Sequence, residues 1–525
     1  LSAALAAGCA AALLFASAPA AAKKSKTKSG KGSSMDGFGP VEPFYQDWDF
    51  MRVESPESIV FDSKGNAYVS LTLNAYVSVL SPEGEEITQV PLPQGDCRPT
   101  VPTETSFPLS TLQFGMAMDK DDNLYISLLA CAEGFPWPEE PNPNTGLWKM
   151  DTTTYELTQL YQIPEADGRG RQQFCCDWME AHWPDVAAMQ TDPTYLFVTS
   201  FFLFPPFYDG DELVPLFDKD DEGRCIPNLS CTLYEAAIGS ALFGLAPFQG
   251  YAQIWNGVEV IGDYIYTTNS YFHEIWRMPK DGSGAPELWL PYGGNGEVPF
   301  GNNVHTIRNK NTMFTAAGFN GLEYYDGHIY VANTAQGKIV KIPMLEADGG
   351  DEDDGMMDSK GKGKKKGSKG MKSGKKITKL IKKTGGADLV PGVPELVNFG
   401  GDSDEFVLDV EGNIYAAQFE DNRVVKIYPN GTEEIIVSGQ LPDGDVCAPD
   451  LSTDIKPDIN EGFSFEVDLP TSVAFGTTKE SKTTLFIANS GFLFFKSCAA
   501  RPPYYNAFPG ITKVEVGVKG AKTLF

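Results

Sequence analysis

Histidine is scarce in this chain, with four residues in 525, and several widespread catalytic motifs are missing. The sequence contains no glycine-rich phosphate loop, no His-Glu-x-x-His pair and no nucleophile elbow around a serine. These absences disfavour nucleotide-driven chemistry, zincin-type proteolysis and α/β-hydrolase chemistry. Beyond residues 1–22, no apolar run is long enough to cross a bilayer, so we expect no stable membrane insertion once that segment is removed.

Basic residues are few outside two short stretches. Residues 23–31 hold five lysines and residues 360–383 hold twelve, which leaves 25 basic against 70 acidic residues elsewhere. The rest of the chain therefore carries a formal charge of −45. A charge of this sign repels nucleic acid and attracts cations, so we expect no nucleic-acid partner.

The chain is rich in one repeated pattern, an apolar strand, a tight Asp/Gly turn and a second apolar strand that ends in small polar residues. Clear copies begin at Pro56, Phe114, Asn256, Asn320, Ser403 and Pro470, and a weaker copy begins at Pro184. Such units must share one ring to bury their faces. We predict an all-β fold over residues 49–525, a β-propeller of four-stranded blades with long loops on its top face, where the first strands begin. The blade count is six, or seven with the weak copy.

The start of the chain is typical of an exported protein. Residues 1–22 are rich in alanine, end in small residues and precede two lysines, which predicts a cleaved signal peptide rather than a signal anchor. Residues 23–48, rich in Lys, Gly and Ser, are predicted to be disordered. We expect a secreted, extracellular protein, and the sequons at Asn228 and Asn430 predict glycosylation.

Eight cysteines remain after the signal, and an even number in a secreted chain indicates disulfides. Four of them share a register within the repeat, which predicts the equivalent pairs Cys97–Cys131 and Cys447–Cys498 on the top face. The remaining pairing is open, with Cys175 or Cys176 joined to Cys225 or Cys231.

An insertion over residues 346–376 interrupts the unit that begins at Asn320 and switches from an acidic to a lysine-rich tract. We interpret this segment as a disordered, solvated surface insertion. The alternative is an arm that contacts polyanions such as acidic polysaccharide, phosphate-rich surfaces or silica.

The long top-face loops are aromatic. Their aromatic side chains form either a lid that packs on itself or an apolar wall for a small-molecule substrate. The candidate wall residues are Phe135, Trp137, Phe201, Phe204, Tyr208, Phe494 and Tyr504.

One position recurs at the start of the first strand when the units are aligned on the tyrosine of the second strand. Glu57 and Asp404 precede that tyrosine by eleven residues, and Asn256 and Asn320 precede it by ten because their turn is one residue shorter. The four side chains should converge on the ring axis, where mixed carboxylate and amide oxygens suit Ca²⁺ rather than zinc. Asp185 has the same register in the weak copy and is a further candidate ligand.

The pattern of Glu57, Asn256-Gly257, Asn320-Gly321 and Ser403-Asp404 resembles the metal-binding signature of the SMP-30/gluconolactonase-like propellers. That superfamily includes diisopropylfluorophosphatase, paraoxonase-like and strictosidine-synthase-like proteins. The resemblance implies a central Ca²⁺ that polarises a lactone carbonyl or a phosphoryl oxygen, with Asp404 as nucleophile or base. Family members have six blades, with one unit between the glutamate and the first asparagine, where this chain has two.

A metal-polarised carbonyl needs a proton-transfer partner, and His182 and His305, predicted in top-face loops, are the better histidine candidates. We therefore predict a calcium-dependent hydrolase acting on a lactone or another ester of a small, partly apolar molecule. One alternative is a non-catalytic binding propeller with a structural calcium, whose aromatic face recognises glycan or protein. Another is a strictosidine-synthase-like condensation.

Overall fold

The computed structural model describes most of the repeat units and few of their long connections. The described residues are 38–48, 54–71, 75–95, 111–130, 142–163, 255–270, 274–291, 318–334, 337–347, 373–399, 401, 403–419, 421–438, 467, 469–490 and 509–521, together with the backbone of four short strands between 208 and 227.

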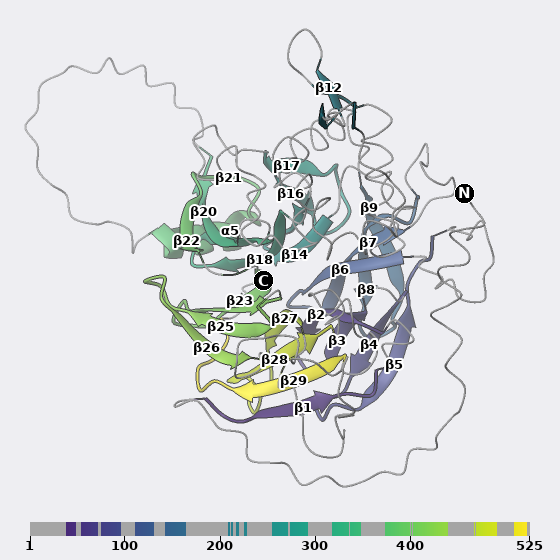
Figure 1. Cartoon of the computed structure of the whole chain (residues 1–525), viewed down its shortest axis with the longest axis vertical. Helices are drawn as coiled ribbons and strands as arrows, with labels where there is room; N and C mark the ends of the chain where they lie inside the picture. Colours follow the sequence, from purple (N-terminus) through teal and green to yellow (C-terminus); the bar gives the residue numbers. More distant parts are fainter. Residues whose placement is uncertain are drawn as a thin grey trace, which may run out of the picture.

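Six antiparallel sheets of four or five strands are arranged in a ring (Figure 1). Blade 1 consists of β2 (Pro56–Phe61), β3 (Ala67–Leu71), β4 (Tyr76–Leu80) and β5 (Glu86–Pro91), and blade 2 of β6 (Thr111–Met118), β7 (Asn123–Ala130), β8 (Gly146–Asp151) and β9 (Leu157–Gln162). Blade 3 consists of β14 (Trp255–Ile261), β15 (Tyr264–Asn269), β16 (Glu274–Pro279) and β17 (Glu287–Leu290), and blade 4 of β18 (Phe319–Tyr325), β19 (His328–Asn333), β20 (Lys338–Glu346), β21 (Leu389–Pro391) and β22 (Glu395–Phe399). Blade 5 consists of β23 (Ser403–Leu408), β24 (Ile414–Gln418), β25 (Arg423–Ile427) and β26 (Glu433–Ser438), and blade 6 of β27 (Pro470–Phe475), β28 (Thr484–Asn489), β29 (Gly510–Glu515) and β1 (Val41–Tyr45).

Two further pairs of short strands lie outside these blades. They are β10 (Tyr208–Asp209) with β11 (Glu212–Leu213), and β12 (Phe217–Lys219) with β13 (Cys225–Pro227).

Burial decreases from the second strand of a blade to its outer strand. In blade 1, every residue of β3 (AYVSL) is buried, whereas β5 (EITQVP) has one buried residue, Val90. Strands rich in Val, Ile, Leu and Tyr pack well between two neighbouring blades, and a charged strand tolerates solvent. The apolar core consequently lies between the faces of adjacent blades, as where Phe61 and Ile59 of blade 1 pack with Phe486 and Ile511 of blade 6.

The innermost strands β2, β6, β14, β18, β23 and β27 close the ring, because each contacts the next and β27 contacts β2. The propeller therefore has six blades, as in the family that the sequence resembles. The alternative of seven blades is wrong. Because β6 lies directly against β14, no blade lies between them, although the weak copy at Pro184 falls between these strands in the sequence. The copy itself lies outside the described residues.

The N-terminal strand β1 completes blade 6 by pairing antiparallel with β29, with Val41 opposite Val514 and Tyr45 opposite Ile511. This strand lies within residues 23–48, which the composition predicted to be disordered. The prediction fails here because Tyr45 and Trp48 are buried against blades 1 and 6, and that burial offsets the entropy of ordering the segment. The propeller thus includes residues before the expected boundary at residue 49.

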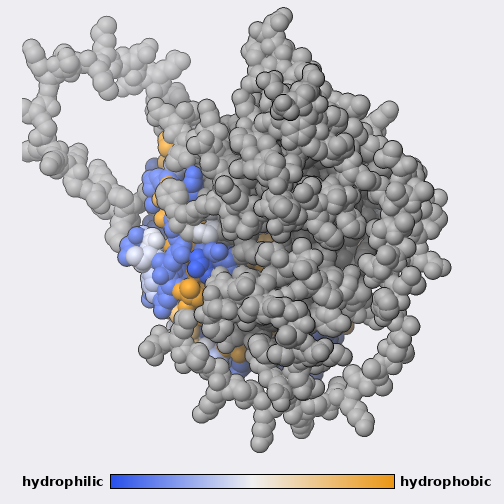
Figure 2. Space-filling view, in the orientation of Figure 1, coloured by the Kyte–Doolittle hydropathy of each residue, from blue (hydrophilic) through white to orange (hydrophobic). Residues whose placement is uncertain are grey.

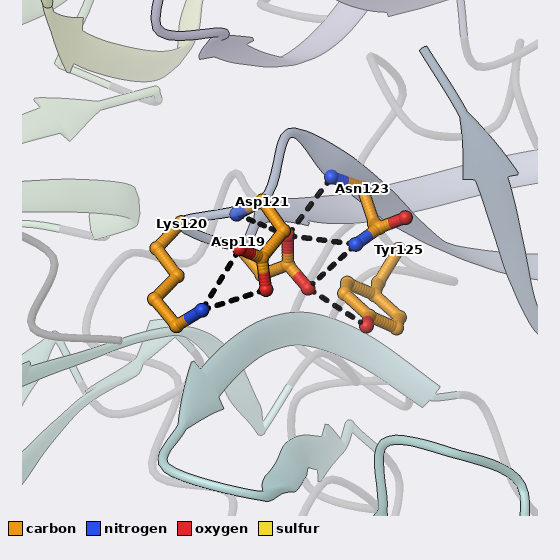
Figure 3. A network of polar contacts seen from close by, with 5 residues as sticks. All are labelled: Asp119, Lys120, Asp121, Asn123 and Tyr125. Atoms are coloured by element: carbon orange, nitrogen blue, oxygen red, sulfur yellow. Dashed lines mark hydrogen bonds and ion pairs between the residues drawn. The ribbon is translucent and has the colours of Figure 1, made fainter. Parts of the chain in front are cut away.

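In three of the blades, an aspartate side chain holds the turn between the first two strands by hydrogen bonds. In blade 2, Asp119 Oδ1 accepts from the backbone N–H groups of Asp121 and Asn123, both at 2.9 Å (Figure 3). Asp119 Oδ2 accepts from the Tyr125 hydroxyl at 3.1 Å. The equivalent sets in blades 1 and 5 are Asp62, Asn66 and Tyr68, and Asp409, Asn413 and Tyr415. The aspartate thereby fixes the spacing from turn to tyrosine in blades 1, 2 and 5, which helps to explain why the tyrosines aligned these repeats.

One helix is present among the described residues, α5 (Ser373–Thr384), and it lies between β20 and β21 of blade 4, overlapping the end of the predicted insertion. Ile377 and Ile381 of the helix are buried in the core shared by blades 3 and 4. The backbone N–H of Asp263, in the hairpin turn between β14 and β15, donates to the carbonyl of Gly385 just after the helix, at 2.8 Å. The insertion was predicted to be disordered through residue 376, but the helix begins at Ser373 because its apolar side packs on the propeller. No helix in the described ranges has both the length and the apolar character needed to cross a bilayer.

Candidate metal centre

Each innermost strand has an irregularity in its pairing with the second strand, close to where the strand begins. Two residues lie inside the irregularity in blades 1 to 5, and one residue does in blade 6. A β-bulge of this kind redirects side chains relative to the normal alternation. The first enclosed residues are Glu57, Phe114, Asn256, Asn320, Asp404 and Thr471. The four predicted ligands therefore occupy equivalent bulge positions, with Phe114 and Thr471 in the two remaining blades.

Glycine follows the two asparagines because neighbouring inner strands approach each other closely at the bulges. A Cβ on Gly257 would lie 2.4 Å from the carbonyl oxygen of Asn320, and one on Gly321 would lie 2.9 Å from the carbonyl oxygen of Asp404. Real Cβ atoms do not approach backbone this closely. The contacts hold the bulges of blades 3, 4 and 5 side by side around the axis.

The second strand supplies hydroxyl groups for backbone groups that the bulges leave unpaired. The N–H of Gly257 donates to Thr268 Oγ1 at 2.8 Å, and Thr268 Oγ1 donates to the carbonyl of Asn320 at 2.7 Å. One threonine thus connects the bulge of blade 3 to that of blade 4. Blade 1 has a similar bond, from the Ser58 N–H to Ser70 Oγ at 2.9 Å. This explains the small polar residues at the ends of the second strands.

The side chains of Asn320 and Asp404 meet directly, because Asn320 Nδ2 donates a hydrogen bond to Asp404 Oδ1. Asp404 is 8% exposed. Burial raises its pKa well above the usual range, the negative charges of Glu57 and Glu405 raise it further, and the bond from Asn320 opposes the shift. Glu57 and Asp404 are therefore close enough to repel each other, as expected of two carboxylates directed at one cation.

Asn320 Oδ1 is buried and has no hydrogen-bond partner. Leaving a buried amide oxygen unsatisfied costs about 1–3 kcal/mol, and a cation at this position would satisfy it. Asn256 and Asn320 are buried, at 7% and 5% exposure. Glu57, Asn256, Asn320 and Asp404 thus form a set of hard oxygen donors that fits Ca²⁺, with water completing its coordination. Zinc is disfavoured, since the set contains neither histidine nor cysteine.

The amides are essential to this interpretation. Within the described ranges, no group of three or more His, Cys, Asp and Glu side chains is arranged to hold a metal ion. Two carboxylates alone provide too few protein ligands for Ca²⁺, so a calcium ion at this centre would also need the oxygens of the two asparagines.

Three further carboxylates continue from the candidate metal centre along the innermost strands. Burial raises the pKa of Glu405 to about 7, against hydrogen bonds from Ser472 and Ser58. Burial, followed by the charge of Glu405, raises the pKa of Glu323 to about 8. Glu259 is 7% exposed, and burial together with the charge of Glu323 raises its pKa well above the usual range.

Sequence reasoning missed these three glutamates, although a signal for two of them was present. Glu259 and Glu323 each lie three residues after a ligand asparagine, in the repeated pattern Asn-Gly-x-Glu. The equivalent positions of the other inner strands hold apolar residues. We name Glu259, Glu323 and Glu405 the axial glutamates.

Many predicted site residues lie outside the described residues. This holds for the candidate proton-transfer residues His182 and His305, for Asp185, for Asn228 and for the cysteines and aromatic wall residues, with only the backbone of Tyr208 and Cys225 described. Asn430 is exposed in a turn, where its Oδ1 accepts from the Thr432 backbone N–H at 3.0 Å and Oγ1 at 2.7 Å. Glycosylation there remains a prediction.

No protein-family model and no curated protein matches the chain. Solved structures similar to it include a calcium-binding regucalcin from Agrobacterium tumefaciens, at 11% identity, 92% coverage of this chain, 95% of that chain and a TM-score of 0.41. A putative gluconolactonase matches at 10% identity, 93% and 96% coverage and a TM-score of 0.39. A gluconolactonase from Xanthomonas campestris matches at 10% identity, 91% and 90% coverage and a TM-score of 0.37. At identities near 10% and TM-scores of 0.37 to 0.41, these likenesses do not assign the chain to a family. What those proteins bind does not transfer to this chain at such values, so any function depends on the chain's own residues.

Proposed function

We propose that this protein is a calcium-dependent hydrolase that acts on a lactone or another ester of a small, partly apolar molecule. The observation that supports it best is the orphaned Oδ1 of Asn320 beside the Asn320–Asp404 hydrogen bond, in a ring of equivalent bulges that also holds Glu57 and Asn256. A cation held there would satisfy Asn320 Oδ1 and reduce the repulsion between Glu57 and Asp404.

Calcium bound at this centre would supply Lewis-acid polarisation of a substrate carbonyl oxygen. Asn320 orients Asp404 by donating to Oδ1, which leaves Oδ2 to attack the carbonyl carbon or to take a proton from water. The packed glycines fix the neighbouring backbone, so these side chains are held in place before substrate binds. We assign His182 and His305 as candidate proton-transfer residues, and the aromatic wall residues as the candidate apolar surface for the substrate.

Export also remains a proposal, supported by the signal-like residues 1–22, the even number of cysteines after residue 22 and the two sequons. The mass of protein secreted from a eukaryotic host tests it directly. We expect loss of residues 1–22, no free thiol and added glycan mass, whereas retention of residues 1–22 or eight free thiols would contradict it.

Calcium binding is tested first, by titration calorimetry on the wild type, Glu57→Gln and Asn320→Ala. Each substitution should weaken calcium affinity at least about tenfold, since each removes one oxygen ligand. Phe114→Leu is the matched control, because Phe114 occupies the equivalent bulge of blade 2 without offering an oxygen. If both ligand variants bind calcium as the wild type does, the centre is misplaced.

Catalysis is tested with a panel of lactones and aryl esters. Asp404→Asn should keep the fold and abolish turnover. A wild type that binds calcium, gains thermal stability from it and turns over no ester would instead support the non-catalytic binding propeller with a structural calcium.

A further inference from the structure

Helix α5 presents a row of lysines to solvent. Lys375, Lys376, Lys379, Lys382 and Lys383 are all exposed. Residues spaced by three, four and seven positions lie on one side of a helix, so the five ammonium groups form a single stripe along α5. Successive turns of the stripe are about 5–6 Å apart along the helix axis.

The propeller holds this stripe in a fixed position. Ile377 and Ile381 on the opposite side of α5 are buried in the core of blades 3 and 4. Thr378 Oγ1 lies 3.2 Å from the Tyr324 hydroxyl, and the Gly385 carbonyl accepts from Asp263. A ligand that binds the stripe therefore does not have to order the helix first, which removes an entropic cost.

The stripe gathers five positive charges on a protein that is acidic overall. Lys376 pairs with Glu346, Nζ to Oε2, at 2.8 Å. The ion pairs found within the described ranges involve none of the other four lysines. The side of the molecule that carries blade 4 and α5 is mostly hydrophilic in the view of Figure 2. Among the described residues, four of the five lysines therefore have no ion pair, although the charge of Lys383 also acts on Glu346.

We propose that this stripe, Lys375, Lys379, Lys382 and Lys383 with Lys376 beside them, binds a linear acidic polysaccharide. A row of point charges along about 12 Å of helix suits a chain polymer that carries a carboxylate or sulfate on successive sugars. Membrane binding is disfavoured because the apolar side of α5 is buried in the propeller and cannot enter a bilayer. Nucleic acid is disfavoured because α5 has neither an aromatic residue for base stacking nor an arginine for bidentate phosphate binding.

The location of α5 is compatible with a bound polymer that leaves the candidate metal centre accessible. The helix lies against the hairpin turns at the far ends of β14 and β18, whereas Asn256 and Asn320 lie where these strands begin. A polysaccharide on the stripe would therefore hold the protein by the face opposite its candidate metal centre.

The test compares the full chain with a variant in which Lys375, Lys379, Lys382 and Lys383 are changed to glutamine. The probes are heparin, which is sulfated, and polygalacturonate, which is carboxylated, measured at several salt concentrations. The variant should bind both probes at least about tenfold more weakly at 0.1 M salt and show a shallower salt dependence. Equal melting temperatures would show that the substitutions leave the fold intact.

The matched control carries four glutamines at Lys64, Lys479, Lys482 and Lys519, which lie in or beside turns at the same end of the propeller. This control should bind within about twofold of the wild type, because these lysines lie on three separate segments and not along one helix. Wild-type protein that binds neither polysaccharide, or a stripe variant that binds as tightly as the control, would refute the proposal. Equal or tighter binding of single-stranded DNA or phosphatidylserine vesicles by the wild type would overturn the assignment to polysaccharide.

Discussion

Replacing Glu323 by glutamine should flatten the dependence of stability on pH between pH 6 and pH 8. Burial and the charge of Glu405 raise the pKa of Glu323 from 4.5 to about 8. The folded protein therefore retains a proton that the unfolded chain releases above pH 4.5. The resulting stabilisation is complete below pH 4.5 and is lost as the pH rises through 8.

The magnitude follows from the pKa itself. Each pH unit within this window lowers the free energy of unfolding by about 1.4 kcal/mol per group. From pH 6 to pH 8 the loss due to Glu323 is about 2 kcal/mol, somewhat less than two full units, because the group is half ionised at pH 8.

Urea unfolding at pH 6, 7 and 8 measures this difference. Chelator should be present throughout, since a bound cation would itself favour ionised carboxylates. The free energy of unfolding of Glu323→Gln should fall by about 2 kcal/mol less than that of the wild type across the interval. Glu85→Gln is the control, because Glu85 is exposed and its variant should follow the wild type. If the curves of Glu323→Gln and the wild type are parallel, the account of a buried, protonated glutamate is wrong.

Three further changes test the packing of the propeller, the first of them at the candidate metal centre. Gly257→Ala should lower stability by about 1–3 kcal/mol and weaken calcium binding, because the new Cβ would lie 2.4 Å from the carbonyl oxygen of Asn320. Thermal melting and calcium titration measure the two effects. An unchanged calcium affinity would contradict the close approach of the two inner strands. Asp409→Ala should lower the free energy of unfolding in urea by about 2–4 kcal/mol, because it leaves buried donors unpaired. Asp151→Ala, in an exposed turn, should lower it by less than about 1 kcal/mol. Equal losses would refute the assigned role of the buried turn. Deleting residues 41–45 should expose β29, seen as faster amide exchange in that strand, and unchanged protection would exclude the closure by β1.

The sequence predicted the ring and its inner register because both depend on short-range chemistry. An aspartate that binds the tyrosine six residues later sets the same spacing in blades 1, 2 and 5, so equivalent positions could be found by counting. The blade number required longer-range information. A copy of the strand pattern, such as that at Pro184, does not reveal whether its strands join the ring, and only the contact between β6 and β14 excludes it.

The sequence allowed the candidate ligands of the metal centre to be predicted, but not the residues that surround them. Glu57, Asn256, Asn320 and Asp404 repeat at one register, which the sequence displays. The axial glutamates occupy strand positions that are otherwise apolar, and their mutual repulsion becomes visible only when strands of adjacent blades are placed together. Helix α5 was missed because its lysine content indicates disorder, whereas Ile377 and Ile381 anchor it to a surface that only the folded propeller provides.

The shared construction of blade 6 has a consequence for synthesis on the ribosome. The strand β1 is made before the other described strands, and its partner β29 follows more than 450 residues later. During that interval the first blades can assemble, but both edges of β1 remain unpaired. An unpaired strand can associate with other nascent chains. A chaperone that binds short unpaired strands would therefore bind β1. Translation pauses late in the message would prolong the time during which β1 is unpaired.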